Sequence, residues 1–348
     1  MYSSKLICYP LTTVDVAEYA SSHPFEIVSV HEHQNTSEVV TSAYSDIGFV
    51  LSASGHPNII SPEYVGTIIL KYLLKLTSVH LKHDKVNKAV MTVPAKFSPL
   101  QRAATGTAFR DAGLKVVRVL DEPTAAAVAY DLHKNQNIHH ILVYDFGGGT
   151  LDVSILYMSQ GSVQVYATDG DNFLGGSDFD VCLYDYIRSK VFELTSGVLW
   201  LDSLNSTNLR HGNHSGEPSN GSVLECNSAA IRKEIENLKK QLSTEYSVHF
   251  NCIYDQYEST KQTVSVEVSR ADFESSCEHL FDRCLIPVNR ILDDLGMVGM
   301  NIDEVVLVGG TTRIPLVKQK LKAVFSKHLN DKIDPDITIA YGASSILT

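Results

Sequence analysis

Hydrophobic positions along the chain form short unbroken runs that are separated by stripes with helical spacing. Four runs, each followed by a proline, an acid or a glycine, predict buried strands at residues 89–93, 116–120, 141–144 and 305–308. Helical stretches lie between several of these runs, and such strand–helix alternation is typical of an α/β fold. A chain of 348 residues is too long for one simple hydrophobic core, so we expect two lobes.

Several predicted helices begin with clear capping signals. Ser61-Pro62-Glu63 combines a capping serine, a proline at the first helical position and an acid in the first turn. Ser98-Pro99-Leu100 predicts a second start of this kind, and Pro123 begins an alanine-rich helix. The clearest helix covers residues 231–243, where one apolar stripe is formed by Ile231, Ile235, Leu238 and Leu242.

Composition and charge narrow the possible functions. Hydrophobic residues make up 44% of the chain and charged residues 20%, as in ordinary soluble domains. A formal net charge of −11 argues against a nucleic-acid partner, because binding to a phosphate backbone needs clustered cations. We expect no membrane insertion, since Lys71 and Lys75 interrupt the longest apolar candidate at 65–76. No signal-peptide pattern follows Met1.

Cysteines and polar residues add two further expectations. The six cysteines contain no C-x-x-C pair, which argues against a zinc site, and they are too sparse for a disulfide-built scaffold. We therefore expect buried thiols. Residues 203–228 are rich in Ser, Asn, Gly and His and predict a polar insertion. Four glycosylation sequons mildly favour a secretory compartment: Asn35, Asn205, Asn213 and Asn220.

The strongest chemical signal is Asp145-x-Gly147-Gly148-Gly149-Thr150-x-Asp152, which lies between two predicted strands. Glycines expose backbone N–H groups without a Cβ atom, so such a hairpin can surround phosphate oxygens. Thr150 adds a hydroxyl, and Asp145 can hold a metal-bound water. This is not a Walker loop, because no G-K-[ST] follows. The alternative is a glycine hairpin that binds nothing.

Three weaker signals each have a simpler explanation. Gly309-Gly310-Thr311-Thr312 follows its own buried strand and is either a second half of the site, with Arg313 against a base, or only a tight turn. Glu122 either captures a metal-bound water or complements a helix dipole. One face of the 231–243 helix either contacts a nucleoside or is solvated: Glu236, Lys239, Lys240 and Ser243.

Together, in this order and spacing, these motifs resemble the ATPase core of the seventy-kilodalton heat-shock chaperones. The resemblance extends over nearly the whole chain, and within the family it is strongest to the microsomal member that consists of the ATPase core alone. Its carrying segments are Val90 to Ala95 with Gln101-Arg102, Asp121 to Ala127, Asp145 to Ser154, Leu174 to Asp180, Val306 to Pro315, Asp334-Pro335-Asp336 and Ala340 to Ala343.

The resemblance implies an actin-like ATPase fold with two ribonuclease-H-like lobes around a nucleotide cleft. Lobe I would comprise 1–135 with 331–348 returning to it, and lobe II would comprise 136–330. The implied cofactors are ATP or ADP, Mg²⁺ and K⁺. Glu122 and Asp145 would hold waters of the magnesium shell, and Asp152 would help to bind K⁺. Nucleotide contacts would come from Gly147, Gly148, Gly149, Thr150, Gly175, Gly176, Glu236, Lys239, Lys240, Ser243, Gly309, Gly310, Arg313 and Asp336.

The sequence departs from the family pattern in its N-terminal part. No D-L-G-T-T-type phosphate loop precedes Asp145, so lobe I is expected to be incomplete and ATP hydrolysis to be poor. The family's catalytic lysine is carried over to Lys5 by its distance from His23-Pro24-Phe25, although the neighbours differ. Lys240 stands where many members have an arginine, and an ammonium has no flat face to stack on adenine.

Three functions remain at this point. The first is an ATP-binding, weakly hydrolysing chaperone-like core without a peptide-binding domain. The second is a non-enzymatic interaction module, and the third is a sugar or acetate kinase, which the series of chaperone motifs disfavours. Co-chaperones or nucleotide-exchange factors are the implied protein partners. The resemblance implies an endoplasmic-reticulum or microsomal location, whereas a chain without an upstream signal peptide would be cytoplasmic.

Overall fold

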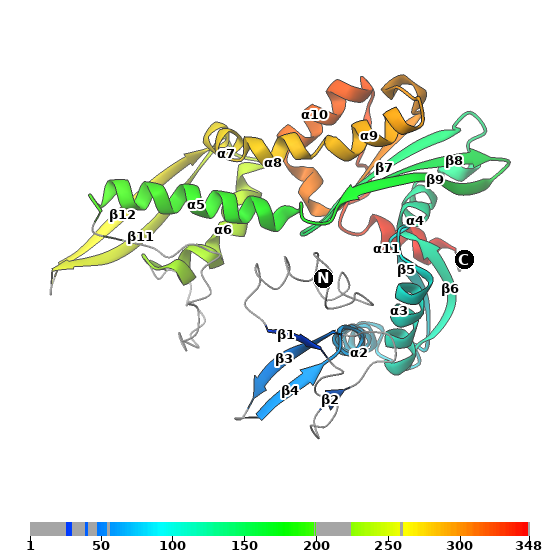
Figure 1. Ribbon diagram of the computed structural model, residues 1–348, viewed down its shortest axis with the longest axis horizontal. Coiled ribbons are helices and arrows are strands. Elements are labelled where there is room, and N and C mark those ends of the chain that lie inside the picture. The colour runs from blue at the N-terminus through cyan, green and yellow to red at the C-terminus, as the bar shows by residue number, and fades with distance from the viewer. Residues whose placement is uncertain are drawn as a thin grey trace. The chain divides into compact units, whose positions relative to one another are not determined.

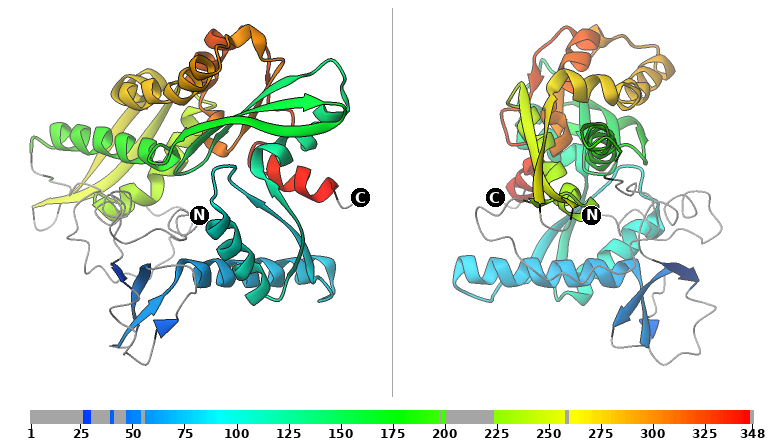
Figure 2. Two further views of the ribbon diagram at one scale, coloured as in Figure 1. Left: turned by 45° about the vertical axis from the view of Figure 1, so that its right-hand side comes forward. Right: turned by 90° about the vertical axis from the view of Figure 1, so that its left-hand side faces the viewer.

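The structure is a computed structural model, and it describes residues 26–29, 39–40, 47–53, 56–197, 199, 224–257 and 260–346. Helices and strands are mixed along the chain, which confirms the predicted α/β content (Figures 1 and 2). Backbone contacts divide the chain into two units. Unit 1 extends to Leu132 and resumes at Ile337, and unit 2 runs from His133 to Asp336.

Unit 1 contains two small sheets. The first has the strand order β1-β3-β4-β2, with antiparallel β1/β3 and β3/β4 pairs and a parallel β2/β4 pair. The second pairs β5 and β6 in parallel around helix α3. The strands are β1 Ile27–Ser29, β2 Val39–Val40, β3 Ile47–Ala53, β4 His56–Ile60, β5 Lys88–Val93 and β6 Lys115–Asp121.

The helices of unit 1 begin where their capping signals predict. The Ser61 hydroxyl accepts a hydrogen bond from Tyr64 N–H, and Ser98 forms a reciprocal capping box with Gln101. Helix α11 lies so close to α4 that a Cβ atom on Gly342 would stand 1.8 Å from Ala125 O. The helices are α2 Pro62–Leu81, α3 Pro99–Asp111, α4 Glu122–Ala129 and α11 Thr338–Ser345, and the short 3-10 turn Leu132–Lys134 follows α4.

Unit 2 is built on a five-stranded sheet with the order β14-β13-β7-β8-β9. The hairpin β7/β8 is antiparallel, and β13 and β14 run parallel to β7 and to each other. Helix α9, Ile286–Asp294, lies against β8 and β9 (Figure 1). The strands are β7 His140–Phe146, β8 Leu151–Ser159, β9 Ser162–Asp171, β13 Glu304–Val308 and β14 Leu329–Asn330.

A second sheet and the remaining helices complete unit 2. Strands β10 Leu224–Glu225, β11 Ser247–Tyr257 and β12 Thr260–Ser269 form a three-stranded sheet that contacts helices α5 and α6. The apolar stripe of α6 is buried, as its periodicity predicts. The helices are α5 Gly176–Leu194, α6 Ser228–Leu242, α7 Arg270–Ser276, α8 Glu278–Arg283, α9 Ile286–Asp294 and α10 Pro315–Phe325, with 3-10 turns at Gly299–Asn301 and Gly310–Arg313.

The buried core of unit 2 brings these elements together. Four aromatic rings cluster at its centre, with Phe179 of α5 touching the rings of Phe146, Phe273 and Phe281. All four side chains are at most 2% exposed. Because Phe146 ends strand β7, this cluster fixes the position where the glycine hairpin begins.

Four cysteines correct the expectation of buried thiols, because they form two disulfides in unit 2. Cys182 of α5 is bonded to Cys277 at the junction of α7 and α8, and Cys226 is bonded to Cys252 of β11. The bonded cysteines are 95 and 26 residues apart in sequence, and no spacing motif predicts such pairs. Cys284 is a buried free thiol, and Cys8 lies outside the described residues.

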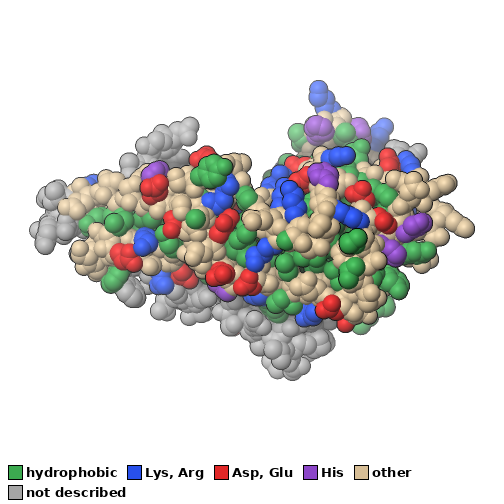
Figure 3. Space-filling view, turned by 90° about the horizontal axis from the view of Figure 1, so that it is seen from above, with side chains coloured by type: hydrophobic (Ala, Val, Ile, Leu, Met, Phe, Trp, Pro, Cys, Tyr) green, Lys and Arg blue, Asp and Glu red, His purple; other side chains and the backbone are tan. Residues whose placement is uncertain are grey.

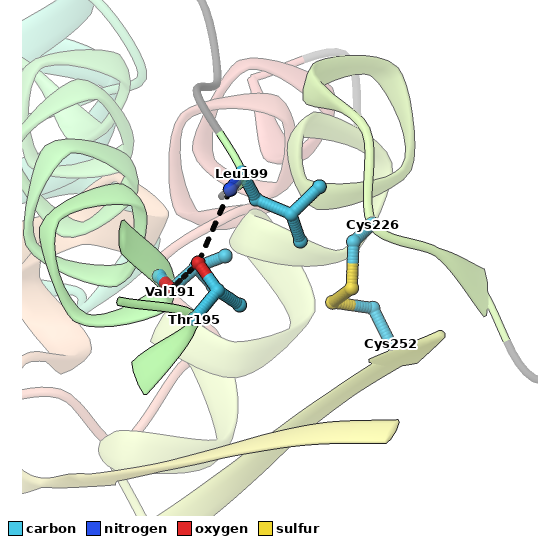
Figure 4. Close-up of a disulfide and its surroundings, with 5 residues drawn as sticks. All are labelled: Val191, Thr195, Leu199, Cys226 and Cys252. Atoms are coloured by element: carbon cyan, nitrogen blue, oxygen red, sulfur yellow. Dashed lines mark hydrogen bonds between the residues drawn. A yellow bond between two sulfur atoms is a disulfide. The ribbon is translucent and has the colours of Figure 1, made fainter. Parts of the chain in front are cut away.

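The second disulfide lies near the end of helix α5 (Figure 4). There the Thr195 hydroxyl donates to Val191 O at 2.8 Å and accepts from Leu199 N–H at 3.3 Å. The predicted polar insertion falls mainly on residues outside the described part of the chain, but residues 224–228 form β10 and begin α6.

Acidic and basic side chains are interspersed on the face that Figure 3 displays. None of the helices in the described part of the chain has the length and apolar character needed to cross a membrane.

Candidate functional site

The glycine hairpin forms as predicted, between β7 and β8 of unit 2. Asp145 pairs in register with Asp152, and Phe146 pairs with Leu151. Gly147 N–H donates to Thr150 O at 3.0 Å and closes the turn. The turn therefore consists of the four residues 147–150, held at both ends by the strand ladder.

Two carbonyl groups of this turn are held by neighbouring elements. Gly147 O accepts hydrogen bonds from Gly176 N–H at 3.1 Å and from the Thr311 hydroxyl at 2.9 Å. Gly148 O accepts from Ser177 N–H at 2.8 Å and from the Ser177 hydroxyl, also at 2.8 Å. The first turn of α5 and the 3-10 turn after β13 thus supply four donors to two peptide units.

The held carbonyls determine where the next N–H groups point. In a trans peptide the C=O and N–H bonds are antiparallel, and none of the described peptide bonds is cis. Gly148 N–H shares a peptide unit with Gly147 C=O, and Gly149 N–H shares one with Gly148 C=O. Both N–H groups therefore point away from the donors that bind these two carbonyls. A Cβ atom on Gly148 would meet nothing within 4 Å. A phosphate oxygen could approach this backbone closely, as anion-binding loops require.

The other predicted glycines pack behind the loop. A Cβ atom on Gly175 would lie 2.3 Å from Gly149 N, and one on Gly309 would lie 2.3 Å from Phe146 O. Gly309 also has a φ of +82°, which favours glycine. Gly176 and Gly310 are similarly crowded, by Thr311 Oγ1 at 2.7 Å and by an Asp336 carboxyl oxygen at 2.8 Å. Gly175 and Gly309 thus let two backbones meet closely, and Gly176 and Gly310 leave room for polar side chains.

The carboxylates at the base of the hairpin interact electrostatically. Burial, and secondly the negative charge of Asp152, raise the pKa of Asp145 from 3.8 to about 7. Two carboxyl groups on facing residues carry charge that a cation would offset. Among the described residues no group of three or more His, Cys, Asp or Glu side chains forms a direct metal cage. This donor set fits a cation that is held largely through water.

The side chains predicted to contact a nucleoside are partly engaged with acids. Lys239 Nζ lies 2.8 Å from the Asp180 carboxylate and donates to Gly176 O at 2.7 Å, so it anchors the start of α5. Burial raises the pKa of the Asp180 carboxyl even beside this lysine. Lys240 forms an exposed ion pair with Glu236 at 2.8 Å. This arrangement is expected if this face of the helix is solvated and contacts no nucleoside.

Three further predicted residues have defined places. Arg313 lies 2.5 Å from Asp334 and 3.1 Å from Asp336 in an exposed cluster after the second glycine turn. Ser243 is half-buried just beyond α6, where its N–H donates to Lys240 O at 3.1 Å. Thr150 is half-buried between the glycines and β8.

Two predicted catalytic residues are not among those that surround the hairpin in unit 2 of the described structure. Glu122 is the first residue of α4 in unit 1, next to Asp121, which forms a 2.7 Å ion pair with Arg102. Lys5 lies outside the described residues. The structure therefore brings together the hairpin, the glycines that pack behind it and Lys239.

Sequence reasoning missed Ser177 and Thr311, which hold the loop from behind, and Asp180, which pairs with Lys239. A usable signal exists for Ser177, because it is a hydroxyl residue directly after a glycine pair at a helix start. Thr311 stands in the second glycine turn, but its hydrogen-bond partner is 164 residues away in sequence. Pattern and spacing do not reveal such a pair.

Comparisons with known proteins agree on the family. A family model described as Hsp70 protein matches residues 22–206 and 224–347. The chaperone protein DnaK of Mycoplasma mobile is 38% identical over 284 residues, which make up 81% of this chain and 43% of that protein. The chain thus spans less than half the length of this curated relative.

Proposed function

Because the chain belongs to the Hsp70 family, we propose that it binds ATP and ADP through the 147–150 turn, within an actin-like fold. The observation that carries this proposal is the pair of held carbonyls, which turn the N–H groups of Gly148 and Gly149 away from the protein's own donors. An anion can accept hydrogen bonds from backbone N–H groups held in this way, without first ordering the loop.

The residues around the turn would share the work of nucleotide binding. Asp145 would hold water molecules of a Mg²⁺ ion, which, when bound, would neutralise phosphate charge. Asp152 would contribute to a K⁺ site, and Thr150 would donate its hydroxyl to a phosphate. The nucleoside would lie along α6 and the second glycine turn, near Glu236, Lys239, Lys240, Ser243, Arg313 and Asp336.

Hydrolysis by this chain is proposed to be slow. Its 348 residues contain one glycine turn of this acid-flanked kind and no D-L-G-T-T segment. A single loop supplies fewer donors to the charge that develops on the transferred phosphoryl group, and such donors are usually a large part of catalysis. A single-turnover rate typical of a family member with both phosphate loops would contradict this part of the proposal.

The cellular location is proposed to be an oxidising compartment, such as the endoplasmic reticulum. Disulfides form and persist in such compartments and are rare in the cytosol of mesophiles. The Cys182–Cys277 and Cys226–Cys252 bonds support this location. A chain isolated from cells with all four thiols free would oppose it.

Thermal unfolding in the presence of ligand tests nucleotide binding. A ligand that binds only the folded state stabilises it by about 2.7 kcal/mol at a free concentration of 100 Kd. We expect Mg-ADP to raise the melting temperature progressively, with adenosine giving a smaller rise because it lacks phosphates. An unchanged melting temperature in millimolar Mg-ATP and Mg-ADP would refute nucleotide binding.

That negative result would favour the second candidate, a non-enzymatic interaction module in protein quality control. Its supporting observation is the ion pairing of Lys240 with Glu236 and of Arg313 with Asp334, which occupies side chains that a nucleoside would need. Co-chaperones or nucleotide-exchange factors are the proposed partners in either case.

A further inference from the structure

Ser177 stands in the first turn of α5, directly behind the phosphate-facing turn. Its backbone N–H and its hydroxyl both donate to Gly148 O, each at 2.8 Å. One residue therefore supplies two hydrogen bonds to a single carbonyl group. The neighbouring carbonyl, Gly147 O, is held differently, by Gly176 N–H from α5 and by the Thr311 hydroxyl from the other glycine turn.

The Gly148–Gly149 peptide unit needs such a restraint. Neither residue has a Cβ atom, so no side chain of their own opposes rotation of the peptide plane between them. A rotated plane would turn Gly148 O toward an approaching phosphate and withdraw the Gly149 N–H group. Two donors from Ser177 oppose this rotation, because both hydrogen bonds must break before the carbonyl can leave.

The platform that carries Ser177 is itself well anchored. Gly175 N–H donates to the Asp178 carboxylate at 2.7 Å, and Lys239 Nζ donates to Gly176 O at 2.7 Å. Farther along the helix, Cys182 is covalently bonded to Cys277. Since α5 is fixed on both sides of this turn, the Ser177 hydroxyl is presented to Gly148 O in a constant position.

We propose that Ser177 is a positioning residue for phosphate binding. Its hydroxyl holds the Gly148–Gly149 peptide plane and so keeps the 147–150 turn in the shape that would receive the phosphates. This inference rests on the proposed nucleotide binding and adds a residue that acts on the phosphates through the loop backbone. It should therefore affect ligands with phosphates and leave the bare nucleoside unaffected.

The test compares the affinities of Mg-ADP and adenosine for the full chain, measured by calorimetry, in four proteins: wild type, Ser177→Ala, Ser177→Thr and Ser78→Ala. One hydrogen bond of ordinary net strength corresponds to about a threefold to tenfold change in affinity. We expect Ser177→Ala to lose ADP affinity by this factor and to keep adenosine affinity. Ser177→Thr retains the hydroxyl and should stay within about twofold of wild type.

Ser78→Ala is the matched control, because it also removes a hydroxyl that donates to a carbonyl, Leu74 O at 2.9 Å. It should leave both affinities unchanged. Equal ADP affinity in wild type and Ser177→Ala would overturn the inference while nucleotide binding stands. A parallel loss of adenosine affinity, or a Ser177→Thr variant as weak as Ser177→Ala, would overturn it as well. A wild-type protein that binds no ADP would overturn both proposals.

Discussion

The two glycine turns of unit 2 follow neighbouring parallel strands, and their glycines serve opposite purposes. β7 and β13 are paired so that Val308 lies beside Asp145, and glycines follow both strands. At Gly148 a missing side chain leaves open space, with nothing within 4 Å of a Cβ position. At Gly309 the missing side chain is replaced by the protein's own backbone, with Phe146 O at 2.3 Å.

This difference shows that a glycine pattern alone does not identify a ligand contact. The first turn presents backbone N–H groups, whereas the second turn supports the first from behind and donates the Thr311 hydroxyl to Gly147 O. Both turns would be intolerant of larger residues, but for different reasons. Substitution at the second should affect folding, and substitution at the first should affect binding.

The largest expected effect is that of Gly309→Ala. A Cβ atom there would overlap Phe146 O, and the residue would keep an unfavourable φ of +82°, so we expect the unfolding free energy to fall by about 4 kcal/mol. Gly148→Ala should change it by less than about 1 kcal/mol yet weaken ADP binding. Urea unfolding and calorimetry measure the two quantities. Equal losses of unfolding free energy in the two variants would contradict the proposed difference between the turns.

The Cys182–Cys277 disulfide fixes the helix that holds the first turn. Replacing both cysteines with serine should lower the unfolding free energy by about 3 kcal/mol, mainly because the unfolded chain gains freedom. The Cys226–Cys252 disulfide closes a shorter segment, 26 residues against 95. The matched double-serine variant should therefore lose about 1 kcal/mol less unfolding free energy. Denaturant unfolding of the three proteins gives the comparison. A larger loss for the shorter segment would contradict the chain-entropy argument.

Two threonine hydroxyls in the second turn allow its support of the first turn to be tested separately from its own local structure. Thr311 donates to Gly147 O in the first turn, and Thr312 donates to Gly309 O within its own turn at 2.7 Å. We expect Thr311→Val and Thr312→Val each to lower the unfolding free energy by about 1 kcal/mol. Only Thr311→Val should also weaken ADP binding. A loss of ADP affinity in both variants would show that the two turns behave as one unit.

The smallest effect is expected at the opposite end of β7, where Asp303 accepts hydrogen bonds from His139 N–H at 2.8 Å and His140 N–H at 2.9 Å. Burial acts to raise the pKa of Asp303, but these two donors, together with the electrostatic effects of Lys327 and His140, outweigh it and the pKa is lowered. A lowered folded-state pKa stabilises the protein above the unfolded value of about 3.9, and this contribution is lost as the pH falls through the folded value.

Asp303→Asn should therefore be less stable than wild type by about 1 kcal/mol at pH 7, with the difference shrinking as the pH falls below about 3.9. Unfolding curves at pH 7 and at a series of more acidic values measure it. ADP affinity should remain that of wild type, because Asp303 is remote from both glycine turns along the strands. A stability difference that does not depend on pH would rule out the ionised carboxylate as its cause.

Much of the fold could be predicted from the sequence because its signals are local. Ser61 and Ser98 act within three residues of themselves, and the stripe of α6 depends only on helical periodicity. The hairpin of Asp145 to Asp152 is likewise local, with both strands and the turn in one short segment. Each of these predictions is confirmed by the structure.

The candidate site was predicted less completely, because its supporting contacts join distant segments. The Thr311–Gly147 bond, the Lys239–Asp180 pair and both disulfides depend on how separate elements pack. The same holds for Gly309, whose glycine pattern was visible but whose contact with Phe146 O was not. Sequence identified residues that could meet a ligand, but among the residues that hold them in place it carried a usable signal only for Ser177.

The held carbonyls also have a consequence for the speed of nucleotide capture. Ordering a flexible glycine loop would cost about 1–2 kcal/mol of backbone entropy per residue, and here that ordering is completed during folding. Encounter with a phosphate would need no slow rearrangement of Gly148 and Gly149, so the association rate should approach the diffusion-controlled range. Variants that loosen the loop would then release nucleotide faster, and the lifetime of the bound state would be set by the donors behind the loop.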